Sequence, residues 1–406
     1  MAGFVNSVEY YALLEIFILL AFAELLRSVA ERYGFPPTVG QVIAGVVLGA
    51  GALGGVLNGL LGVQLFVIND LVLLFADFSV ILLIFAAGLE GGFSSLRAAG
   101  SAAIGAAILG DVVPFAATFV VFSFFFPIHT ALLIGVAAAA TSTAVVAAVL
   151  RSEELTRAPA GKFLMNVAAL DDVVGLLLLS VALNFNPSNP NIIAISGGLA
   201  FSVIAWLVIL FASVYIIPRI LRPISSRASH DIPFVILFAL VAIVAALGFS
   251  AIIGAFIAGL AVGESLLATR TKRIADILVA IFGSLFFIVI GAQFDAHALL
   301  DYHVLLYGVL LVVTAVLGKT AGVYVIARFR FPDPRVARAI AIGMIPRAEI
   351  GLIVGAIGYS IGAFDQTILG AIILMALITT AIGGYFFRRT AHALSEEPSG
   401  VPAAAA

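Results

Sequence analysis

Apolar runs, separated by short polar connections, fill almost the whole chain. We distinguish thirteen of them, and each is predicted to be a helix: 8–29, 37–55, 70–91, 99–127, 131–150, 162–185, 192–217, 232–248, 251–267, 275–295, 303–327, 336–359 and 366–387. Most of them reach the roughly 20 residues that a helix needs to cross a hydrocarbon core about 30 Å thick. The pattern therefore predicts an all-α membrane protein with about 13 transmembrane helices.

Composition agrees with this pattern and narrows the possible functions. Of the 406 residues, 63% are hydrophobic and 10% are charged, whereas soluble domains carry about 25% charged residues. The chain has no cysteine, which excludes disulfides and thiolate-bound metals. Its formal net charge of −2 gives no reason to expect a nucleic-acid partner.

The positions of lysine and arginine predict an orientation in the membrane. Of the 20 basic residues, Lys319 and Arg347 lie inside apolar segments, and the remaining 18 all follow odd-numbered segments. Cytoplasmic connections of membrane proteins are enriched in these residues. We therefore expect a multi-pass protein of the inner (cytoplasmic) cell membrane, with its N-terminus outside and its C-terminus in the cytoplasm.

The two halves of the chain resemble each other. GQVIAGVVLG at 40–49 and GAFIAGLAVG at 254–263 share the pattern GxxIAGxxxG, 214 positions apart. Two dipeptides, Gly110-Asp111 and Gly318-Lys319, also correspond to each other and lie 208 positions apart, a comparable spacing. Segments one to six are thus predicted to repeat as segments eight to thirteen. An odd number of crossings separates the counterparts, so the repeats have inverted topology, as in many secondary transporters.

Polar residues or proline interrupt two repeat-related segments in their middles: Thr141, Ser142 and Thr143 in the fifth, and Pro346, Arg347 and Glu349 in the twelfth. Proline removes an N–H group and clashes with the preceding turn, and hydroxyl side chains can satisfy freed backbone groups. We therefore predict two broken helices that cross near the middle of the membrane. Their free carbonyls and helix ends would be available to ions.

Two adjacent carboxylates, Asp171 and Asp172, lie at the centre of the apolar stretch LMNVAALDDVVGLLLL. An ionised aspartate there costs roughly 2.5–3.5 kcal/mol on insertion scales, so such a pair indicates that a cation meets it. Neighbouring residues on a helix point about 100° apart. One aspartate can therefore face the broken helices while the other faces a neighbouring helix, and helical geometry leaves open which does which.

Lys319 is the expected countercharge for one aspartate, because it lies too far from either end of its segment to reach the membrane surface. A Lys–Asp pair about 4 Å apart gains roughly 4 kcal/mol at an effective dielectric of about 20. Arg347 and Glu349 are expected to be supporting core charges, with Arg347 compensating helix ends. Asp111 is the repeat counterpart of Lys319, and the sequence leaves open whether it titrates or is a hydrogen-bonded structural acid.

Several of these stretches together are similar to one known family. ALDDVVGLL, ATSTAVV, VLGKTAG and GMIPRAEIGLIVG resemble the monovalent cation–proton antiporter-2 family, closest to NapA-type sodium/proton antiporters, with the membrane domains of Kef-type potassium efflux systems as relatives. PPTVGQVIAGVVLG and FAAGLEGGFSSL match the same family, so the likeness extends to about residue 390. Two departures are Gln41, where relatives often have Glu, and Ala348, where they often have Gly.

The resemblance implies a homodimer that moves an ion across the bilayer by alternating access of the elevator type. Residues 1–95 and 231–300 would form the dimerisation scaffold, and residues 96–190 and 301–390 the ion-translocating core. Residues 191–230 would be a linker helix and cytoplasmic loop, and residues 391–406 a disordered tail.

The resemblance also implies roles for single residues. Asp172 would be the carboxylate shared by the transported cation and the proton, and Asp171 would pair with Lys319. Thr141 would lie beside the ion at the crossing, with Ser142 next to it. The expected function is electrogenic exchange of H⁺ for Na⁺ or Li⁺, with no bound cofactor.

Other functions compete with this one. Exchange of K⁺ for H⁺ on the same fold is the nearest alternative, because oxygen ligands and one carboxylate do not distinguish the two ions. A sodium-coupled organic-anion symporter and an ion channel are alternatives within transport. An intramembrane aspartyl protease needs two aspartates that face each other, which neighbours on one helix cannot do.

Overall fold

The computed structural model describes residues 7–62, 66–92, 99–185, 192–222 and 231–395, and within them the regular structure is entirely helical. The α-helices are α1 (Ser7–Arg32), α2 (Pro37–Leu48), α3 (Leu53–Leu61), α4 (Asp70–Gly91), α6 (Gly100–Phe122), α7 (Ile128–Ala139), α8 (Thr143–Ser152), α9 (Pro159–Leu183), α10 (Ile192–Leu221), α11 (Ile232–Ala246), α12 (Ala251–Gly263), α13 (Ala268–Ala292), α14 (Tyr302–Arg330), α15 (Pro334–Gly343), α16 (Glu349–Ser360) and α17 (Gln366–Thr390).

The helices have the length and composition of membrane spans. Within the described ranges, 9 helical stretches are long and apolar enough to cross a bilayer, and α11, α12 and α16 are shorter apolar helices. Each of the thirteen predicted segments coincides with one helix or with two consecutive helices. The chain is a multi-pass membrane protein, as expected, while the number of crossings stays a prediction.

The C-terminal end differs from the sequence expectation. Residues 391–394, which we assigned to a disordered tail, form a 3₁₀ helix (Ala391–Leu394) directly after α17. Its Ala391 and Leu394 side chains are buried in a cluster with Phe387 and Val336. The burial of these apolar side chains stabilises the 3₁₀ helix at this place. The rest of the predicted tail, 396–406, lies outside the described residues.

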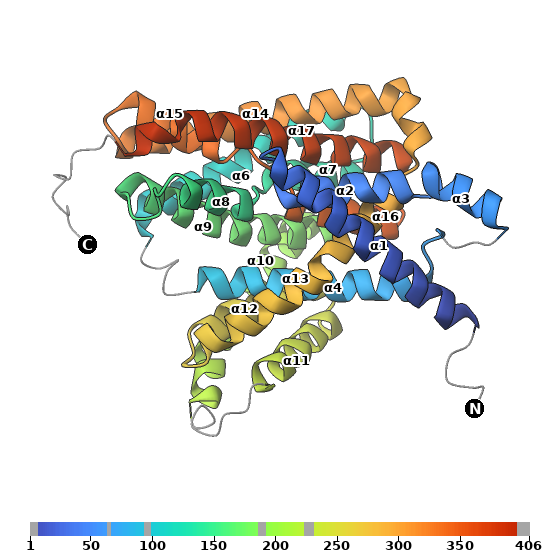
Figure 1. Ribbon diagram of the computed structural model, residues 1–406. Coiled ribbons are helices and arrows are strands. Elements are labelled where there is room, and N and C mark those ends of the chain that lie inside the picture. The colour runs from blue at the N-terminus through green and yellow to red at the C-terminus, as the bar shows by residue number, and fades with distance from the viewer. Residues whose placement is uncertain (1–6, 63–65, 93–98, 186–191, 223–230, 396–406) are drawn as a thin grey trace.

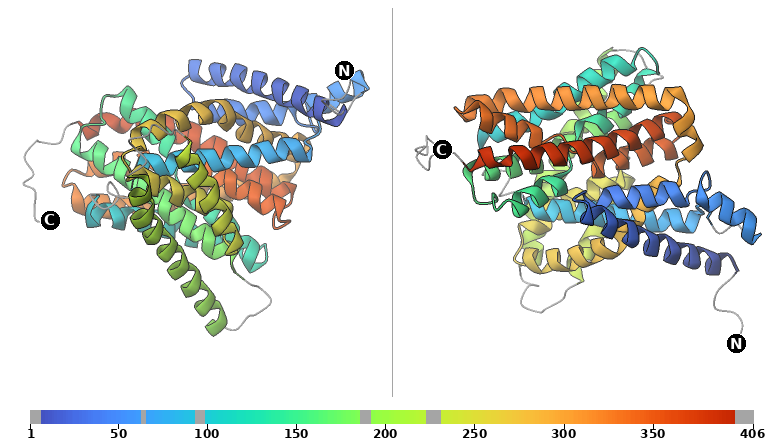
Figure 2. Two further views of the ribbon diagram at one scale, coloured as in Figure 1. Left: turned by 90° about the horizontal axis from the view of Figure 1, so that it is seen from below. Right: turned by 45° about the horizontal axis from the view of Figure 1, so that its top comes forward.

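The helices pack in two groups (Figures 1 and 2). In one group, α2 and α4 pack against α13, α1 against α2, and α12 against α4 and α11. In the other, α6 packs against α7, α9 and α14, while α17 packs against α14, α15 and α16. Helix α10 contacts α12 of the first group and α9 of the second. Its position between them suits the linker role predicted for residues 191–230.

The glycines of the two GxxIAGxxxG stretches make equivalent contacts. A methyl group added to Gly45 of α2 would collide with the carbonyl oxygen of Ile288 in α13. At the repeat-related positions, a methyl group on Gly259 of α12 would collide with the carbonyl oxygen of Phe85 in α4. Small residues allow helix backbones in membranes to approach this closely. The same crossing therefore occurs twice, as the predicted repeat requires.

The repeat-related helices α6 and α14 pack against each other along their length. A methyl group on Gly318 of α14 would lie 2.6 Å from the Cα of Pro114 in α6, so only glycine fits there. Further along, the Thr118 hydroxyl donates to the Thr314 hydroxyl over 2.8 Å. This close packing holds the side chain that follows Gly318 against α6, in the middle of the second group.

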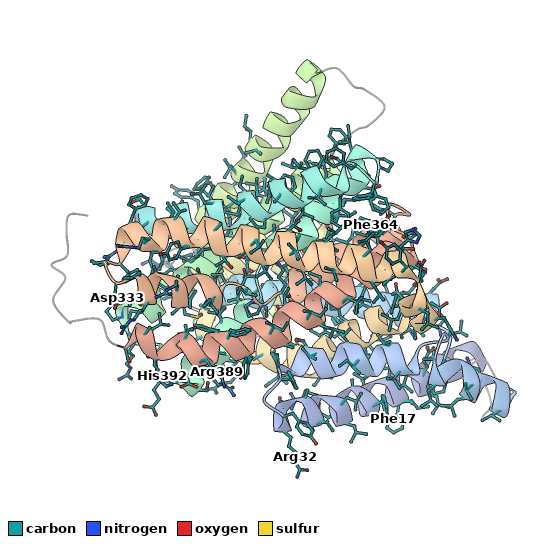
Figure 3. The ribbon with its side chains drawn as sticks, turned by 90° about the horizontal axis from the view of Figure 1, so that it is seen from above. Phe17, Arg32, Asp333, Phe364, Arg389 and His392 are labelled. Carbon is teal, nitrogen blue, oxygen red and sulfur yellow. The ribbon has the colours of Figure 1, made fainter. Side chains whose placement is uncertain are left out.

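The long helices run between two opposite ends of the molecule. Figure 3 shows Asp333, Arg389 and His392 at one end and Phe364 at the other. Asp333 caps the start of α15, and Phe364 shortly precedes α17. Helix α17 therefore spans the distance from one face to the other.

Candidate functional site

The two predicted broken helices are present and touch each other at their breaks. Helix α7 ends at Ala139 and α8 begins at Thr143, while α15 ends at Gly343 and α16 begins at Glu349. The Ser142 N–H donates to the Pro346 carbonyl oxygen over 2.8 Å. These four helix ends therefore meet at one crossing inside the second helix group.

Local sequence explains why both helices stop there. Pro346 has no N–H to continue α15. The Thr141 hydroxyl donates to the Met344 carbonyl oxygen over 3.0 Å. A side chain of the first break therefore satisfies a backbone carbonyl group of the second. Ser142 is the N-cap of α8, and its hydroxyl accepts the Val145 N–H over 3.4 Å. The Thr-Ser-Thr run thus supplies the bonds that the interrupted helices lose.

Arg347 neutralises the carbonyl ends at the crossing. Its Nε donates to the Ala138 carbonyl oxygen over 2.7 Å, and its Nη1 to that of Ile345 over 2.8 Å. Its Nη2 donates to the Ala315 carbonyl oxygen over 2.9 Å. A cation is stabilising where a helix ends in unpaired carbonyl groups. The expected structural role at helix ends agrees with this geometry.

Lys319 lies between two carboxylates. Its Nζ contacts Asp111 Oδ1 at 2.6 Å and also forms an ion pair with Asp171 Oδ1, and all three side chains are fully buried. The same nitrogen donates to the Ala139 carbonyl oxygen over 2.8 Å. The expected Asp171–Lys319 contact is present. Asp111, whose role the sequence left open, is a second partner of the lysine.

Asp171 also contacts the break itself. Its Oδ2 accepts the Thr141 N–H over 2.7 Å. Thr141 lines the cavity together with Asp172, as the expected place beside the ion requires. Its backbone in addition contacts Asp171, so one carboxylate joins the Thr141 N–H and Lys319.

Asp172 points in a different direction and is 7% exposed. Its Oδ2 accepts the Thr143 hydroxyl over 3.1 Å. Thr143 begins α8, and its hydroxyl also lies 3.3 Å from the Ala168 carbonyl oxygen. Thr143 was absent from the predicted site residues, although it belongs to the same Thr-Ser-Thr run as Thr141 and Ser142. Its place one residue beyond the break was the available signal.

A cavity of about 460 Å³ leads to Asp172. The charged and hydroxyl side chains that line it include Arg27, Thr38, Glu90, Thr141, Thr143, Asp172, Asp276, Ser284 and Glu349. Glu90 and Asp276 are exposed and Arg27 is half-buried, whereas Asp172 and Thr141 are buried, so the latter two lie at the closed end. Among the predicted site residues, Asp171, Ser142, Lys319, Arg347 and Asp111 lie behind the cavity wall rather than on it.

The wall opposite Asp172 belongs to the first helix group. There the Gln41 side-chain amide of α2 donates to the Ser284 hydroxyl of α13 over 2.7 Å, and both side chains line the cavity. The cavity therefore lies between the two helix groups. A relative movement of the groups would change its shape.

The donors at the closed end are all oxygens. The Asp172 carboxylate and the hydroxyls of Thr141 and Thr143 are ligand types that hard cations prefer. In the part of the chain that the structure describes, no group of three or more His, Cys, Asp or Glu side chains is placed to hold a metal ion. Asp172 presents its carboxylate to an ion that enters from the cavity, and Glu349 of α16 also lines the cavity.

Two carboxylates outside the spanning helices are explained by local capping. The backbone N–H of His297, and then its imidazole, lower the pKa of Asp295, and those of His303 lower the pKa of Asp301 in the same way. Asp301 is the N-cap of α14. These acids are exposed and line no part of the cavity, so they belong to the loop rather than to the site.

Comparison with known proteins identifies the family. A family model described as "Sodium/hydrogen exchanger, transmembrane" matches residues 17–393. The chain belongs to this family. Members of the transmembrane sodium/hydrogen exchanger family are membrane transporters of monovalent cations and protons, which places this chain among transporters rather than enzymes.

Curated relatives and a solved structure match along almost the whole exchanger chain. The "Na(+)/H(+)-K(+) antiporter GerN" of Bacillus cereus is 28% identical over 387 residues, covering 92% of this chain and 95% of its own. The "Na(+)/H(+) antiporter" of Enterococcus hirae is 26% identical over 372 residues, covering 90% and 94%. The sodium proton antiporter MjNhaP1 of Methanocaldococcus jannaschii matches with a TM-score of 0.68 at 16% identity, covering 95% and 97%, which shows the shared fold.

Proposed function

We propose that this exchanger transports Na⁺ or Li⁺ in one direction and H⁺ in the other, with Asp172 as the shared binding group. The observation that carries the proposal is the place of Asp172 at the closed end of the cavity. Asp171 and Asp111 share Lys319, whereas no cationic side chain of the described residues forms an ion pair with Asp172. An ionised carboxylate in this position needs a cation from solution, either Na⁺ or a proton.

Sodium and proton compete for the same carboxylate. A protonated Asp172 has lost the negative charge that holds Na⁺, and a bound Na⁺ occupies the oxygen that the proton needs. Thr143 donates its hydroxyl hydrogen to Asp172, and Thr141 offers its hydroxyl oxygen at the same end of the cavity. Na⁺ at Asp172 would be held by these oxygens. Exclusive occupancy is what couples the two fluxes.

The movement that exposes Asp172 to each side in turn would be a displacement of the core against the scaffold. The proposed core comprises residues 96–190 and 301–390, and the proposed scaffold comprises residues 1–95 and 231–300. The cavity supports this division, because Asp172 lines it from one side and Gln41 and Ser284 line it from the other. Residues 191–230 would connect the two bodies.

The exchange would be electrogenic, as the Asp-Asp and Lys pattern implies. A cation that arrives at Asp172 repels the Lys319 ammonium, because Lys319 forms an ion pair with Asp171, the neighbour of Asp172 on α9. This repulsion weakens the Asp171–Lys319 ion pair and favours release of a second proton. More than one proton would then leave for each Na⁺ that binds.

The assembly and orientation are part of the same proposal. We place the N-terminus outside and the C-terminus in the cytoplasm of an inner membrane, which makes the cavity open to the cytoplasm near Arg27 and Glu90. Two copies would associate through the scaffold. The large apolar side chains of Leu13 and Phe17 on α1, which are 52% and 66% exposed, support a lipid or subunit contact there.

Potassium is the alternative cation. The observation that favours it is the similarity to GerN, whose name as an Na(+)/H(+)-K(+) antiporter includes K⁺. The oxygen donors around Asp172 do not by themselves select one alkali ion. An organic-anion substrate fits poorly, because the cavity lining contains Glu90, Asp172, Asp276 and Glu349 but one basic residue, Arg27.

The test is exchange by the purified protein in liposomes that carry a pH-sensitive dye and a potential-sensitive dye. We expect Na⁺ and Li⁺ to drive proton movement, with a membrane potential that follows. Proton movement driven by K⁺ but not by Na⁺ would replace the sodium proposal with the potassium one. Exchange without any potential would contradict the electrogenic stoichiometry.

A further inference from the structure

Asp111 is a buried charge that the proposed exchange cycle does not use. It lies on α6 with 0% exposure, and its Oδ1 is 2.6 Å from Lys319 Nζ. Its other oxygen, Oδ2, is buried without a hydrogen-bond partner. A carboxylate oxygen buried in this way costs free energy. An uncharged side chain at position 111 would avoid this desolvation cost, so the presence of a carboxylate there needs an explanation.

Close helix packing holds Asp111 in this position. Gly318, next to Lys319, lies against Pro114 of α6, and a methyl group on Gly110 would lie 2.9 Å from Val323 of α14. The two glycines precede Lys319 and Asp111 respectively. The repeat-related helices thus meet at repeat-related positions, one with an acid and the other with a base.

The formal charges behind the cavity depend on Asp111. The two buried cations, Lys319 and Arg347, are matched in number by Asp111 and Asp171 when all four are ionised. The charge of Asp172 is then left uncompensated, and Glu349, which lines the same cavity, adds a further negative charge when it is ionised. Without the charge of Asp111 the site would be one unit less negative, and an incoming cation would gain less.

We propose that Asp111 is a positioning residue that sets the cation affinity of Asp172. It holds Lys319 as a second anionic partner and offsets the positive charge of the lysine, so that the negative charge at the cavity end remains available to the transported ion. This inference rests on the proposed function, because it specifies how the same site attracts its cation. It acts through charge and through the place of the Lys319 ammonium, not through contact with the ion.

The first test is Asp111→Asn in liposomes, with the Na⁺ dependence of exchange measured at fixed pH. We expect the KM for Na⁺ to rise about tenfold, because one nearby buried charge is lost, while the maximal rate changes much less. Asp111→Glu keeps the charge and is expected to restore most of the affinity.

A matched control separates charge from packing. Thr118→Val removes the hydrogen bond between α6 and α14 on the same helix as Asp111 but removes no charge. We expect this variant to have the KM of the unmodified protein. A KM raised equally in Thr118→Val and Asp111→Asn would assign the effect to helix packing and overturn the proposal.

A double variant tests the charge balance directly. Asp111→Asn combined with Lys319→Gln removes one acid and one base, so the formal charge of the group returns to its original value. We expect the double variant to bind Na⁺ more tightly than Asp111→Asn alone. Binding is measured in detergent as the Na⁺-dependent rise in melting temperature, which needs no transport.

The outcomes distinguish this inference from the proposed function. If the unmodified protein shows no response to Na⁺ in either assay, the proposed sodium exchange itself fails. If the unmodified protein exchanges Na⁺ but Asp111→Asn has an unchanged KM and an unchanged thermal response, only the role of Asp111 fails. A double variant with weaker Na⁺ binding than the single one would also contradict the charge argument.

Discussion

At the scale of single residues, Asp171 and Asp172 are sequence neighbours in different surroundings. Asp171 contacts Lys319 and accepts the Thr141 N–H, whereas Asp172 accepts the Thr143 hydroxyl and reaches the cavity. The sequence predicted that the two would differ, because adjacent helical side chains diverge by about 100°. It could not predict which one faces the cavity, since that depends on how α9 is rotated against the crossing.

Thr143 provides a test of the contact on Asp172. In Thr143→Ala the carboxylate loses the hydroxyl donor at 3.1 Å, and a hydrogen bond to a charged group contributes about 1.5–3 kcal/mol. We expect the KM for Na⁺ to rise about tenfold or more, measured in liposomes. Thr143→Ser keeps the hydroxyl and serves as the control. Equal Na⁺ dependence in the alanine variant and the unmodified protein would show that this hydroxyl does not support the site.

At the scale of elements, the two broken helices could be predicted from the sequence. The way in which their carbonyl ends are neutralised could be predicted only in part. Pro346 and the Thr-Ser-Thr run indicated where the helices stop, and Arg347 was expected at helix ends. The sequence could not show that Arg347 reaches carbonyls of three segments, at Ala138, Ile345 and Ala315. Nor could it show that Asp111 meets Lys319, because that contact follows from the packing of α6 against α14, which are distant in the chain.

The α6–α14 packing can be tested at Gly318. A methyl group in Gly318→Ala would lie 2.6 Å from Pro114 Cα, so α14 must move away from α6 and carry Lys319 away from Asp111. We expect a lower melting temperature in detergent and slower exchange in liposomes. Gly105→Ala lies on the same interface, where a methyl group would be 3.7 Å from Ile326, and should be tolerated. Equal behaviour of the two variants would argue against a tight contact at Gly318.

At the scale of the whole molecule, the repeats and the family were accessible from sequence, and the relation of the two helix groups was not. The GxxIAGxxxG stretches predicted equivalent helices, and the contacts of Gly45 and Gly259 agree. How the groups meet depends on side chains with no recognisable pattern. At the end of the molecule near Phe364, the Gln366 amide donates to the Gln293 carbonyl oxygen over 2.9 Å and to the Tyr359 hydroxyl over 2.8 Å.

Gln366 therefore joins α17 to the end of α13. The Asp295 N–H also donates to the Gln366 Oε1 over 3.1 Å. In Gln366→Ala these bonds are lost, and we expect faster amide hydrogen exchange at the end of α13 and the start of α17. Ser360→Ala, whose hydroxyl bonds within its own helix to Ile357, is the control. Unchanged protection in Gln366→Ala would show that other contacts hold the two groups together at this end.

The account depends most directly on Asp172, and Asp172→Asn tests it. Sodium-driven proton movement is measured in liposomes for this variant and for Asp276→Asn, which makes the same chemical change at the exposed part of the cavity lining. We predict that Asp172→Asn loses exchange with Na⁺, Li⁺ and K⁺ alike, because the asparagine carries neither a proton nor a charge for the cation, while Asp276→Asn retains it. Sodium–proton exchange that persists in a folded, reconstituted Asp172→Asn protein would contradict the assignment of Asp172 as the shared carboxylate.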